Sequence, residues 1–283
     1  MKSVIIEKLG FVLLFGCIII TLFFLGSIMY LIFSQGLRVI NWEFLTAEPY
    51  SGMTKGGVAP AIVGTLYLTL GSIIISLPLG VACAIYLCEY SRGGWIVNII
   101  RMSINNLAGV PSVVFGLFGF AFFVHYLKFG VSILSGSLTL AILVLPGIIS
   151  ATQEALLAVP QSFREASFAL GATQWKTIRK IVLPTSLPGI LTGAILSIGR
   201  VAGETAPILF TACTFYMRGY PTSPFSKCMA LPYHIYALMT EGTHPHEHTQ
   251  IAYGCAVLLL LLVLVISSVA IIIRQKSRRG YGY

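Results

Sequence analysis

The sequence predicts an all-α membrane protein with six transmembrane helices in one membrane domain. Of its 283 residues, 57% are hydrophobic and only 10% are charged, and the mean hydropathy is +0.90. A soluble domain needs about a quarter of its residues charged, so this chain cannot present a water-soluble surface. Six apolar runs are long enough to cross roughly 30 Å of hydrocarbon at about 1.5 Å per residue. They lie near residues 11–33, 61–88, 104–127, 136–157, 188–212 and 251–273.

The first run predicts a retained membrane anchor. It follows Lys2 and Lys8, as the apolar core of a signal peptide would, but it continues for about 23 residues. No cleavage site of small residues precedes Gln35, so we expect the segment to stay in the protein. With the loop that follows it, this helix forms an N-terminal anchor unit, residues 1–60, and residues 61–283 form the main transmembrane domain.

The third run is less regular than the others. Asn105, Asn106, Gly109 and Pro111 make its first turns polar and interrupt a regular helix. Irregular backbone at membrane depth is tolerated only where protein or water surrounds it. Three arrangements therefore remain open for this run: a full crossing, a partly re-entrant segment, or a helix buried among the others.

The basic residues predict that both termini lie in the cytoplasm. An even number of spans places the two ends on one side of the membrane, and lysine and arginine concentrate on the cytoplasmic side. One side holds twelve of them: Lys2, Lys8, Arg92, Arg101, Arg164, Lys176, Arg179, Lys180, Arg274, Lys276, Arg278 and Arg279. The other side holds five: Arg38, Lys55, Lys128, Arg218 and Lys227. The net charge of +9 therefore reflects topology, and we expect no nucleic-acid partner because no folded basic domain is present.

The inner loop at residues 158–187 predicts a short helix, a glycine turn and a second helix. Pro160 ends the fourth span, and Ser162 and Glu165 have the S-x-x-E spacing of a capping box that starts a helix. This first helix ends at Gly171, which supplies the left-handed residue that stops a helix.

The second helix of the loop begins after Thr173, whose hydroxyl can cap it, and runs to about Leu183. Pro184 and Pro188 then close it before the fifth span. The two helices are expected to lie across the cytoplasmic mouth of the protein.

The same loop carries a motif. Residues 165–171 read Glu-Ala-Ser-Phe-Ala-Leu-Gly, and Ile-Val-Leu-Pro stands at 181–184. This spacing resembles the EAA loop of the membrane subunits of ATP-binding-cassette importers, with Ser167 in place of the second alanine. The resemblance implies the type I (MetI-like) permease fold and a docking surface for a separate ATPase subunit. The residues in register, which are the expected ATPase-coupling residues, are Glu165, Ala166, Gly171, Ile181, Leu183 and Pro184. Each of Glu165 and Gly171, taken alone, also fits a purely structural role at a helix end.

Further segments resemble the phosphate-specific importer permease of the PstA type. These are Tyr-Leu-Cys-Glu-Tyr at 86–90, Leu-Ala-Gly-Val-Pro-Ser-Val-Val-Phe-Gly at 107–116, Gly-Arg-Val-Ala-Gly-Glu-Thr-Ala-Pro at 199–207 and Leu-Pro-Tyr-His-Ile-Tyr at 231–236. The resemblance implies import of inorganic phosphate across the inner (plasma) membrane of a bacterium. Its implied partners are a second permease subunit that completes a heterodimer, two ATP-binding-cassette ATPase subunits, an external phosphate-binding protein and membrane lipid. The sister permease of the same importer, and a permease for another oxyanion such as sulfate or molybdate, remain the alternatives.

The sequence has no nucleotide-binding motif of its own. A P-loop needs G-x-x-x-x-G-K-[ST], and this pattern is absent. We therefore expect no cofactor on this chain and no enzymatic activity, with ATP and Mg used by the partner subunit. A self-contained ion channel would need a filter or pore-ring motif. An intramembrane enzyme would need a nucleophile paired with a base, or H-E-x-x-H, within a span. Neither pattern is present.

Arg200 and Glu204 are the candidate residues of the substrate pathway. They stand about twelve and sixteen residues into the fifth span, four apart and therefore on one face of a helix. A charged side chain at that depth costs about 2.5–3.5 kcal/mol, so both are expected to face the bundle interior. A guanidinium offers phosphate two parallel donors, and the carboxylate can hold that guanidinium in place. The alternative is a neutral pair that only fastens helix packing.

Three other polar features allow two interpretations each. Glu89 and Glu154 lie near inner span ends, where a carboxylate can snorkel or join a polar network. The alternating histidines in 244–248 could suggest zinc, but no cysteine or fourth fixed ligand stands nearby, so an exposed loop tip is preferred and no metal is expected. Cys213 and Cys228 flank the last outer loop and could form a disulfide or remain free.

Overall fold

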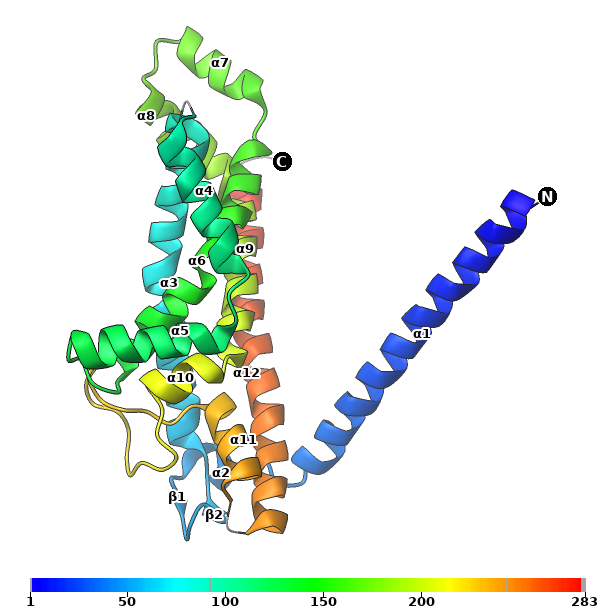
Figure 1. Cartoon of the computed structure of the whole chain (residues 1–283), viewed down its shortest axis with the longest axis vertical. Helices are drawn as coiled ribbons and strands as arrows, with labels where there is room; N and C mark the ends of the chain where they lie inside the picture. The colour runs from blue at the N-terminus through cyan, green and yellow to red at the C-terminus, as the bar shows by residue number, and fades with distance from the viewer. Residues whose placement is uncertain (1, 92, 243, 281–283) are drawn as a thin grey trace.

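The computed structural model describes residues 2–91, 93–242 and 244–280, and helices form most of this part of the chain. In Figure 1, α3, α6, α9 and α12 run along the long axis of one bundle, while α1 leaves the bundle at an angle. The elements in chain order are α1 (Lys2–Gly36), α2 (Trp42–Thr46), β1 (Pro49–Tyr50), β2 (Lys55–Gly56), α3 (Ala59–Ile85), the π-helical turn η1 (Tyr86–Tyr90), α4 (Trp95–Ala108), α5 (Ser112–Gly119), the π-helical segment η2 (Phe120–Tyr126), α6 (Ile133–Leu157), α7 (Gln161–Ala169), α8 (Gln174–Thr177), the π-helical turn η3 (Ile178–Val182), α9 (Leu183–Gly203), α10 (Ala206–Thr211), α11 (Leu231–Thr240) and α12 (Pro245–Gly280).

The predicted all-α membrane fold is confirmed. Among the described residues, five helices are long and apolar enough to cross a membrane alone, and a bent pair of helices makes up to six. The five are Gly10–Gly36, Ala59–Tyr90, Ile133–Leu157, Gln174–Gly203 and Pro245–Lys276. The six-span count therefore depends on the third predicted span, which is the bent pair.

The third span is not a continuous helix over 104–127. The two segments Trp95–Ala108 and Ser112–Tyr126 meet at an angle of 107°, so the chain turns sharply at membrane depth. Pro111 explains the break, because it has no N–H to donate and it disfavours helical backbone in the residue before it. In Figure 1, α5 consequently lies across the bundle while α4 runs along it.

The fifth span begins and ends earlier than 188–212. A single helix runs from Gln174 to Gly203, and Pro184 and Pro188 lie inside it instead of closing a separate helix. Pro184 stands in the first turn of α9, where a missing N–H costs little. The π-helical turn η3 lies directly before Pro184. Its wider geometry appears at its C-cap, where the backbone N–H of Leu183 donates to the carbonyl of Ile178, five residues earlier.

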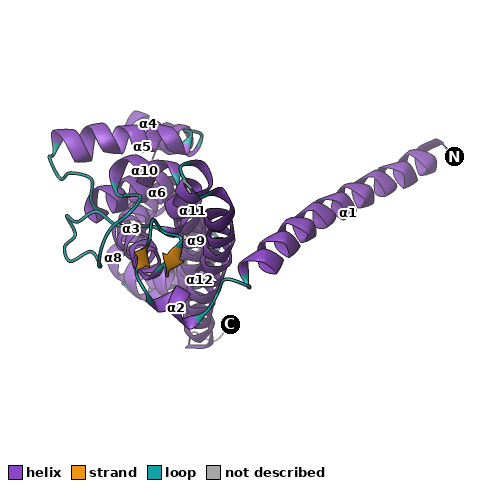
Figure 2. Ribbon diagram, turned by 90° about the horizontal axis from the view of Figure 1, so that it is seen from below, coloured by secondary structure: helices purple, strands orange, loops and turns teal. Residues whose placement is uncertain are grey.

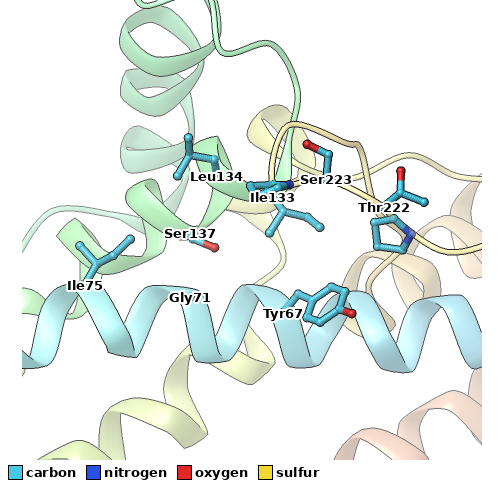
Figure 3. Close-up of a pocket in the computed structure, with 10 residues that line it drawn as sticks. Tyr67, Gly71, Ile75, Ile133, Leu134, Ser137, Thr222 and Ser223 are labelled. Carbon is cyan, nitrogen blue, oxygen red and sulfur yellow. The ribbon is translucent and has the colours of Figure 1, made fainter.

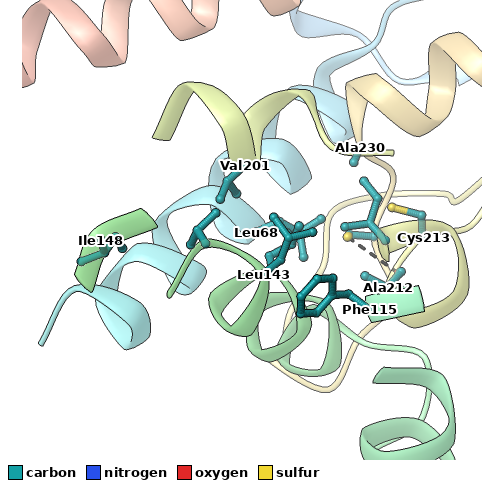
Figure 4. Close-up of a cluster of buried hydrophobic side chains, with 12 residues drawn as sticks. Leu68, Phe115, Leu143, Ile148, Val201, Ala212, Cys213 and Ala230 are labelled. Carbon is teal, nitrogen blue, oxygen red and sulfur yellow. Dashed lines mark hydrogen bonds between the residues drawn. The ribbon is translucent and has the colours of Figure 1, made fainter. Parts of the chain in front are cut away.

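Buried apolar side chains form a continuous core between α3, α5, α6, α9 and α10. Figure 4 shows its central cluster, in which Leu68 of α3, Leu143 of α6 and Val201 of α9 meet. A second cluster lies beneath the outer loops, around Met229 and Leu231, and a third joins the inner ends of α3 and α6 with η3. Helices in a bilayer associate through close packing and not through exclusion of water, so these contacts hold the bundle together.

Glycine permits the close approach of α6 and α9. A Cβ atom added to Gly193 would lie 2.5 Å from the Cβ of Ala151, and one added to Gly189 would lie 2.6 Å from the Cβ of Ala155. Both distances are far below a van der Waals contact, so only glycine fits between these helices. These two contacts therefore hold α6 and α9 together in the halves that lie toward α7.

The first helix stands apart from the bundle, as Figures 1 and 2 show from two directions. None of the apolar window of Gly10–Gly36 is buried within the chain. The N-terminal end of α1 and the C-terminal end of α12 point toward the same end of the molecule as α7 (Figure 1). Arg92, one of the basic residues assigned to that side, lies outside the described residues, as does Thr243 in the outer loop.

Candidate functional site

The EAA segment forms α7 and α8, which project from one end of the bundle (Figure 1). α7 begins at Gln161 with Pro160 as its N-cap, and no side chain caps it. The predicted capping box of Ser162 and Glu165 is therefore wrong: Ser162 already lies inside the helix, two residues after the N-cap, where its hydroxyl is too late to accept from the first free N–H groups. Glu165 and Ala166 are exposed on the helix surface.

Gly171 ends α7 as predicted. Its φ angle is +76°, and its N–H donates to the Phe168 carbonyl over 2.9 Å. The N–H of Ala172 donates to the Ser167 carbonyl over 3.2 Å, which completes a Schellman motif. No atom lies within 4 Å of a Cβ added to Gly171, so glycine is needed here for backbone conformation and not for space. Thr173 then caps α8, as expected, by accepting from the backbone N–H of Lys176.

The other residues of the motif occupy two environments. Ile181, Leu183 and Pro184 are half-buried where η3 enters α9. Ser167, which replaces the second alanine of the motif, is buried, and its hydroxyl lies 2.8 Å from that of Thr177. This hydrogen bond joins α7 to α8, so the substitution has a structural reason.

Arg164 is the residue that sequence reasoning missed. It was assigned only to the membrane topology, but its side chain is buried and its Nη2 lies 2.8 Å from Oε1 of Glu89. Nη1 donates to the Val159 carbonyl over 2.8 Å, and Nη2 donates to the Leu156 carbonyl over 2.9 Å. The polar-network interpretation of Glu89 is confirmed by this pair. One signal in the sequence could have indicated that Arg164 is buried. Arg164 stands three residues before Ser167, so both side chains lie on one face of α7.

Arg200 and Glu204 are close in space, but not in the way the sequence suggested. Glu204 is the C-cap of α9 with extended backbone, so the two residues do not share one continuous helical face. The side chains still meet, with Nε of Arg200 3.6 Å from Oε1 of Glu204. The long distance and the single contact make this a weak ion pair.

The expectation that both charges face the bundle interior is wrong for Arg200. Its side chain is 53% exposed, whereas that of Glu204 is 17% exposed. Arg200 lines a hollow of about 180 Å³ between α6 and α9, with Gly147, Ala151 and Ser197 among its walls. Glu204 instead borders a small internal cavity of about 10 Å³ beside Thr65 and Thr69. α9 ends between them, and this break turns the carboxylate inward while the guanidinium stays outside.

The exposed face of α6 next to Arg200 is also polar. Gly147, Ser150 and Glu154 are exposed and follow one another at helical spacing. Lipid cannot solvate such groups, so polar side chains on the outer surface of a membrane helix indicate a water-filled path or a covering protein. The candidate site is therefore a polar strip that α6 and α9 share and that opens outward from this chain.

A larger hollow of about 400 Å³ lies near the outer end of α3, α6 and the loop at 221–224. Figure 3 shows Tyr67, Gly71 and Ile75 of α3 facing Ile133 and Ser137 across it. None of its lining residues is charged, so it offers an anion no counter-charge. It is not the candidate site.

The outer loops settle two open questions for the described residues. Cys213 and Cys228 are both buried and free, and their backbones pair side by side. Burial, with a further contribution from the neighbouring Cys228 thiol, holds the pKa of Cys213 well above its ordinary value.

The histidine stretch is not a loop tip, because Pro245 begins α12 and His248 is buried with Nε2 3.0 Å from the Gly52 carbonyl. No group of three or more potential metal ligands is found within the part of the chain that the structure describes.

The fold, the projecting helix pair and the absence of a nucleotide motif together define a membrane subunit of a transport system. A model of the family described as binding-protein-dependent transport system inner membrane component matches residues 76–279. The chain belongs to this family. It is therefore a membrane-embedded transport subunit of a bacterial ABC transporter, and ATP hydrolysis is the task of separate subunits.

Individual relatives agree with this assignment. The probable ABC transporter permease protein YqgI of Bacillus subtilis is 32% identical over 252 residues, which cover 85% of each chain. The phosphate transport system permease protein PstA 1 of Mycobacterium tuberculosis is 40% identical over 222 residues, covering 77% of this chain and 71% of that protein. The crystal structure of a bacterial ABC transporter involved in the import of the acidic polysaccharide alginate shares the fold, with a TM-score of 0.66 and 18% identity over 98% of both chains.

Proposed function

We propose that this chain is one of two permease subunits of an importer that carries inorganic phosphate into the cytoplasm. The observation that carries the proposal is the half-exposed guanidinium of Arg200 at membrane depth, on a polar strip of α6 and α9. Membership of this transport family makes the chain a permease subunit. Among the possible substrates, the names of relatives such as PstA 1 of Mycobacterium tuberculosis favour phosphate.

The chemistry of Arg200 suits a tetrahedral oxyanion. A guanidinium presents parallel donors to two oxygens of one phosphate and keeps its charge at any physiological pH. The weak contact with Glu204 leaves most of these donors free for substrate. The carboxylate lowers the net attraction, so an anion can arrive and leave again, as transport requires.

The second permease subunit covers the surface that this chain leaves polar or unpaired. Asn105 and Asn106 at the end of α4 are exposed, as is Arg200, and none of these side chains can face lipid at low cost. Most of α1 is likewise uncovered by the chain, because only its last turns contact α12. A similar permease packed against these surfaces would place the substrate path between the two subunits.

The cytoplasmic partner is an ATPase subunit that binds α7 and α8. The turn between these helices exposes Leu170, 88% accessible, together with Phe168 and Trp175. Large apolar side chains gathered on a projecting tip mark a protein-binding surface. An external phosphate-binding protein would deliver substrate at the opposite end, where the outer loops lie.

The test is uptake in proteoliposomes that contain the complete complex of this chain, its sister permease and the ATPase, with the binding protein outside. We expect uptake of radiolabelled phosphate that needs ATP inside and is not reduced by a tenfold excess of sulfate or molybdate. Uptake of sulfate or molybdate in place of phosphate would assign the permease to another oxyanion and reject the proposed substrate.

A further inference from the structure

A buried ion pair at the end of the molecule that carries α7 involves neither Arg200 nor Glu204. Glu89 lies on the π-helical turn η1 that ends the second span, and Arg164 lies on α7, 75 residues later. Their side chains are only 10% and 11% exposed. Nε of Arg164 faces both carboxylate oxygens over 3.3 and 3.4 Å, and Nη2 lies 2.8 Å from Oε1. The fork of the guanidinium therefore holds the carboxylate along one edge.

The same guanidinium also binds the end of α6. It donates to the carbonyls of Leu156, in the last turn of α6, and Val159, just beyond the end of that helix. A cation is favoured at a helix C-terminus because the free carbonyls carry partial negative charge. One side chain thus ties α7 to the inner ends of both α3 and α6.

One apolar contact accompanies this polar link, because Phe163 of α7 packs against the buried cluster that includes Leu87 and Leu156. A hollow of about 480 Å³ separates α7 from the inner ends of α6 and η1, and Arg164 crosses it. Gln161 and Phe168 of α7 line this hollow instead of filling it. The remaining side-chain bridge of α7, between Ser167 and Thr177, leads only to α8 and so to α9.

The π-helical turn receives a second contact from the same segment. The side-chain amide of Gln174 in α8 donates to the backbone carbonyl of Glu89. Turns of this kind are rare and are frequent at functional sites. Both α7 and α8 therefore contact Glu89 near the end of the second span, α7 through Arg164 and α8 through Gln174.

We infer that Arg164 and Glu89 are positioning residues that make α3 and α6 move together with α7 when the ATPase moves it. The inference rests on the proposed docking of α7 and α8 on an ATPase subunit. Without this latch of Arg164 and Glu89, a displacement of α7 would reach α3 and α6 through the packing of Phe163 and the short link at 158–160, or indirectly through α8 and α9, but through no charged side chain. With it, three membrane helices shift as one body, and Arg200 on α9 keeps its place beside α6.

The test compares two conservative variants with matched controls in the assembled complex. Glu89→Gln removes the charge and keeps the shape, and Arg164→Lys keeps the charge and loses the fork. Glu247→Gln and Arg179→Lys make the same changes at exposed positions outside the ion pair and the polar strip. Two quantities are measured per assembled complex: substrate molecules transported per ATP hydrolysed, and the distance between spin labels at Ser162→Cys on α7 and Tyr90→Cys with and without ATP.

We expect both latch variants to assemble with the ATPase and to hydrolyse ATP while the transport-to-hydrolysis ratio falls by about fivefold. The label distance should stay constant between nucleotide states in the parent and controls, and should change with ATP in the latch variants. If the variants only lower the amount of complex, and the ratio and distances per complex match the parent, the pair is structural and the inference is wrong.

The distance measurement separates this inference from the proposed function. It needs ATP and the ATPase but no substrate, so it remains decisive if the substrate is not phosphate. If ATP changes no distance in either the parent or the latch variants, α7 transmits no movement and the inference is rejected, whatever the substrate.

Discussion

Arg200 shows how one residue can combine a cost to folding with a use in function. A guanidinium on the outer surface of a membrane helix is disfavoured unless water or a partner meets it. The weak pair with Glu204, with 3.6 Å between Nε and Oε1, does not neutralise it fully. The residue is therefore better explained by what it binds than by the packing it supports.

The first prediction concerns this pair. Arg200→Lys should lower phosphate uptake strongly, because a lysine keeps the charge but cannot present two parallel donors. Arg200→Ala should lower it as well, because Glu204 would then meet the anion uncompensated. Arg218→Lys, the same change at an exposed arginine of the outer loop, serves as the control and should transport normally.

The double variant Arg200→Ala, Glu204→Ala separates guidance of the anion from helix packing. Removing both charges relieves a purely structural pair, so near-parental uptake in an assembled complex would reject the guiding role. We expect the double variant to remain as poor as Arg200→Ala. Uptake is measured in vesicles with the amount of assembled complex determined alongside.

His234 supports a second prediction, on pH. Burial, with a contribution from His248, lowers its pKa to about 4 from an ordinary value of 6.5. Between pH 4 and pH 6.5, the unfolded chain therefore binds more protons than the folded chain. The free energy of unfolding is therefore highest above pH 6.5 and falls as the pH drops toward 4. The loss approaches roughly 3 kcal/mol below pH 4.

The measurement is the unfolding midpoint of the purified protein in detergent from pH 7 to pH 4. The parent should lose stability on acidification, and His234→Leu should lose less because it cannot take up the proton. His246→Leu, an exposed histidine nearby, is the matched control and should keep the parental slope. Equal slopes for the parent and His234→Leu would contradict the prediction.

At the scale of the element, α7 and its turn illustrate local rules that operate even in a membrane protein. Gly171 stops the helix with φ +76°, and two backbone hydrogen bonds close the motif. The start of the same helix was predicted wrongly, because Pro160 and not Ser162 occupies the cap. Helix stops with glycine are more specific signals than S-x-x-E, which also occurs inside helices.

The third prediction tests whether this turn matters for coupling. Gly171→Val should strain the backbone by about 1–2 kcal/mol, because a β-branched residue resists positive φ. The tip that carries Leu170 would then be misplaced, so ATP hydrolysis should continue while uptake falls. Gly171→Asn is the control, since asparagine tolerates this conformation, and it should keep most of the uptake. Parental uptake by Gly171→Val would show that the turn geometry does not serve coupling.

At the scale of the whole molecule, the two ends of the chain point toward the end that carries α7 (Figure 1). This agrees with a chain that crosses the membrane an even number of times, with the bent pair counted as one span. The basic residues predict that this end lies in the cytoplasm.

The fourth prediction tests the orientation with membrane-impermeant thiol reagents on a version without native cysteines. Leu170→Cys on the coupling turn should react only after the membrane is permeabilised, and Thr222→Cys in the exposed outer loop should react in intact cells. Reaction of Leu170→Cys in intact cells would reverse the topology.

The sequence alone determined the class of fold, the places of most spans, the stop at Gly171 and the EAA segment. These depend on local properties: apolar length, left-handed glycine and the spacing of a motif. The broken third span was indicated by Pro111 and Gly109, but its 107° bend was not, because the direction of a chain after a break depends on what it packs against.

Only the tertiary structure decided how the charged residues are used. Glu89 and Arg164 are 75 residues apart, so no local pattern could pair them. The end of α9 at Gly203 turned Glu204 inward and left Arg200 outside, against the expectation of one shared face. Hydrophobic length and helix stops act within a few turns and can be read along the chain, whereas a buried charge takes its partner from whichever helix the fold brings beside it.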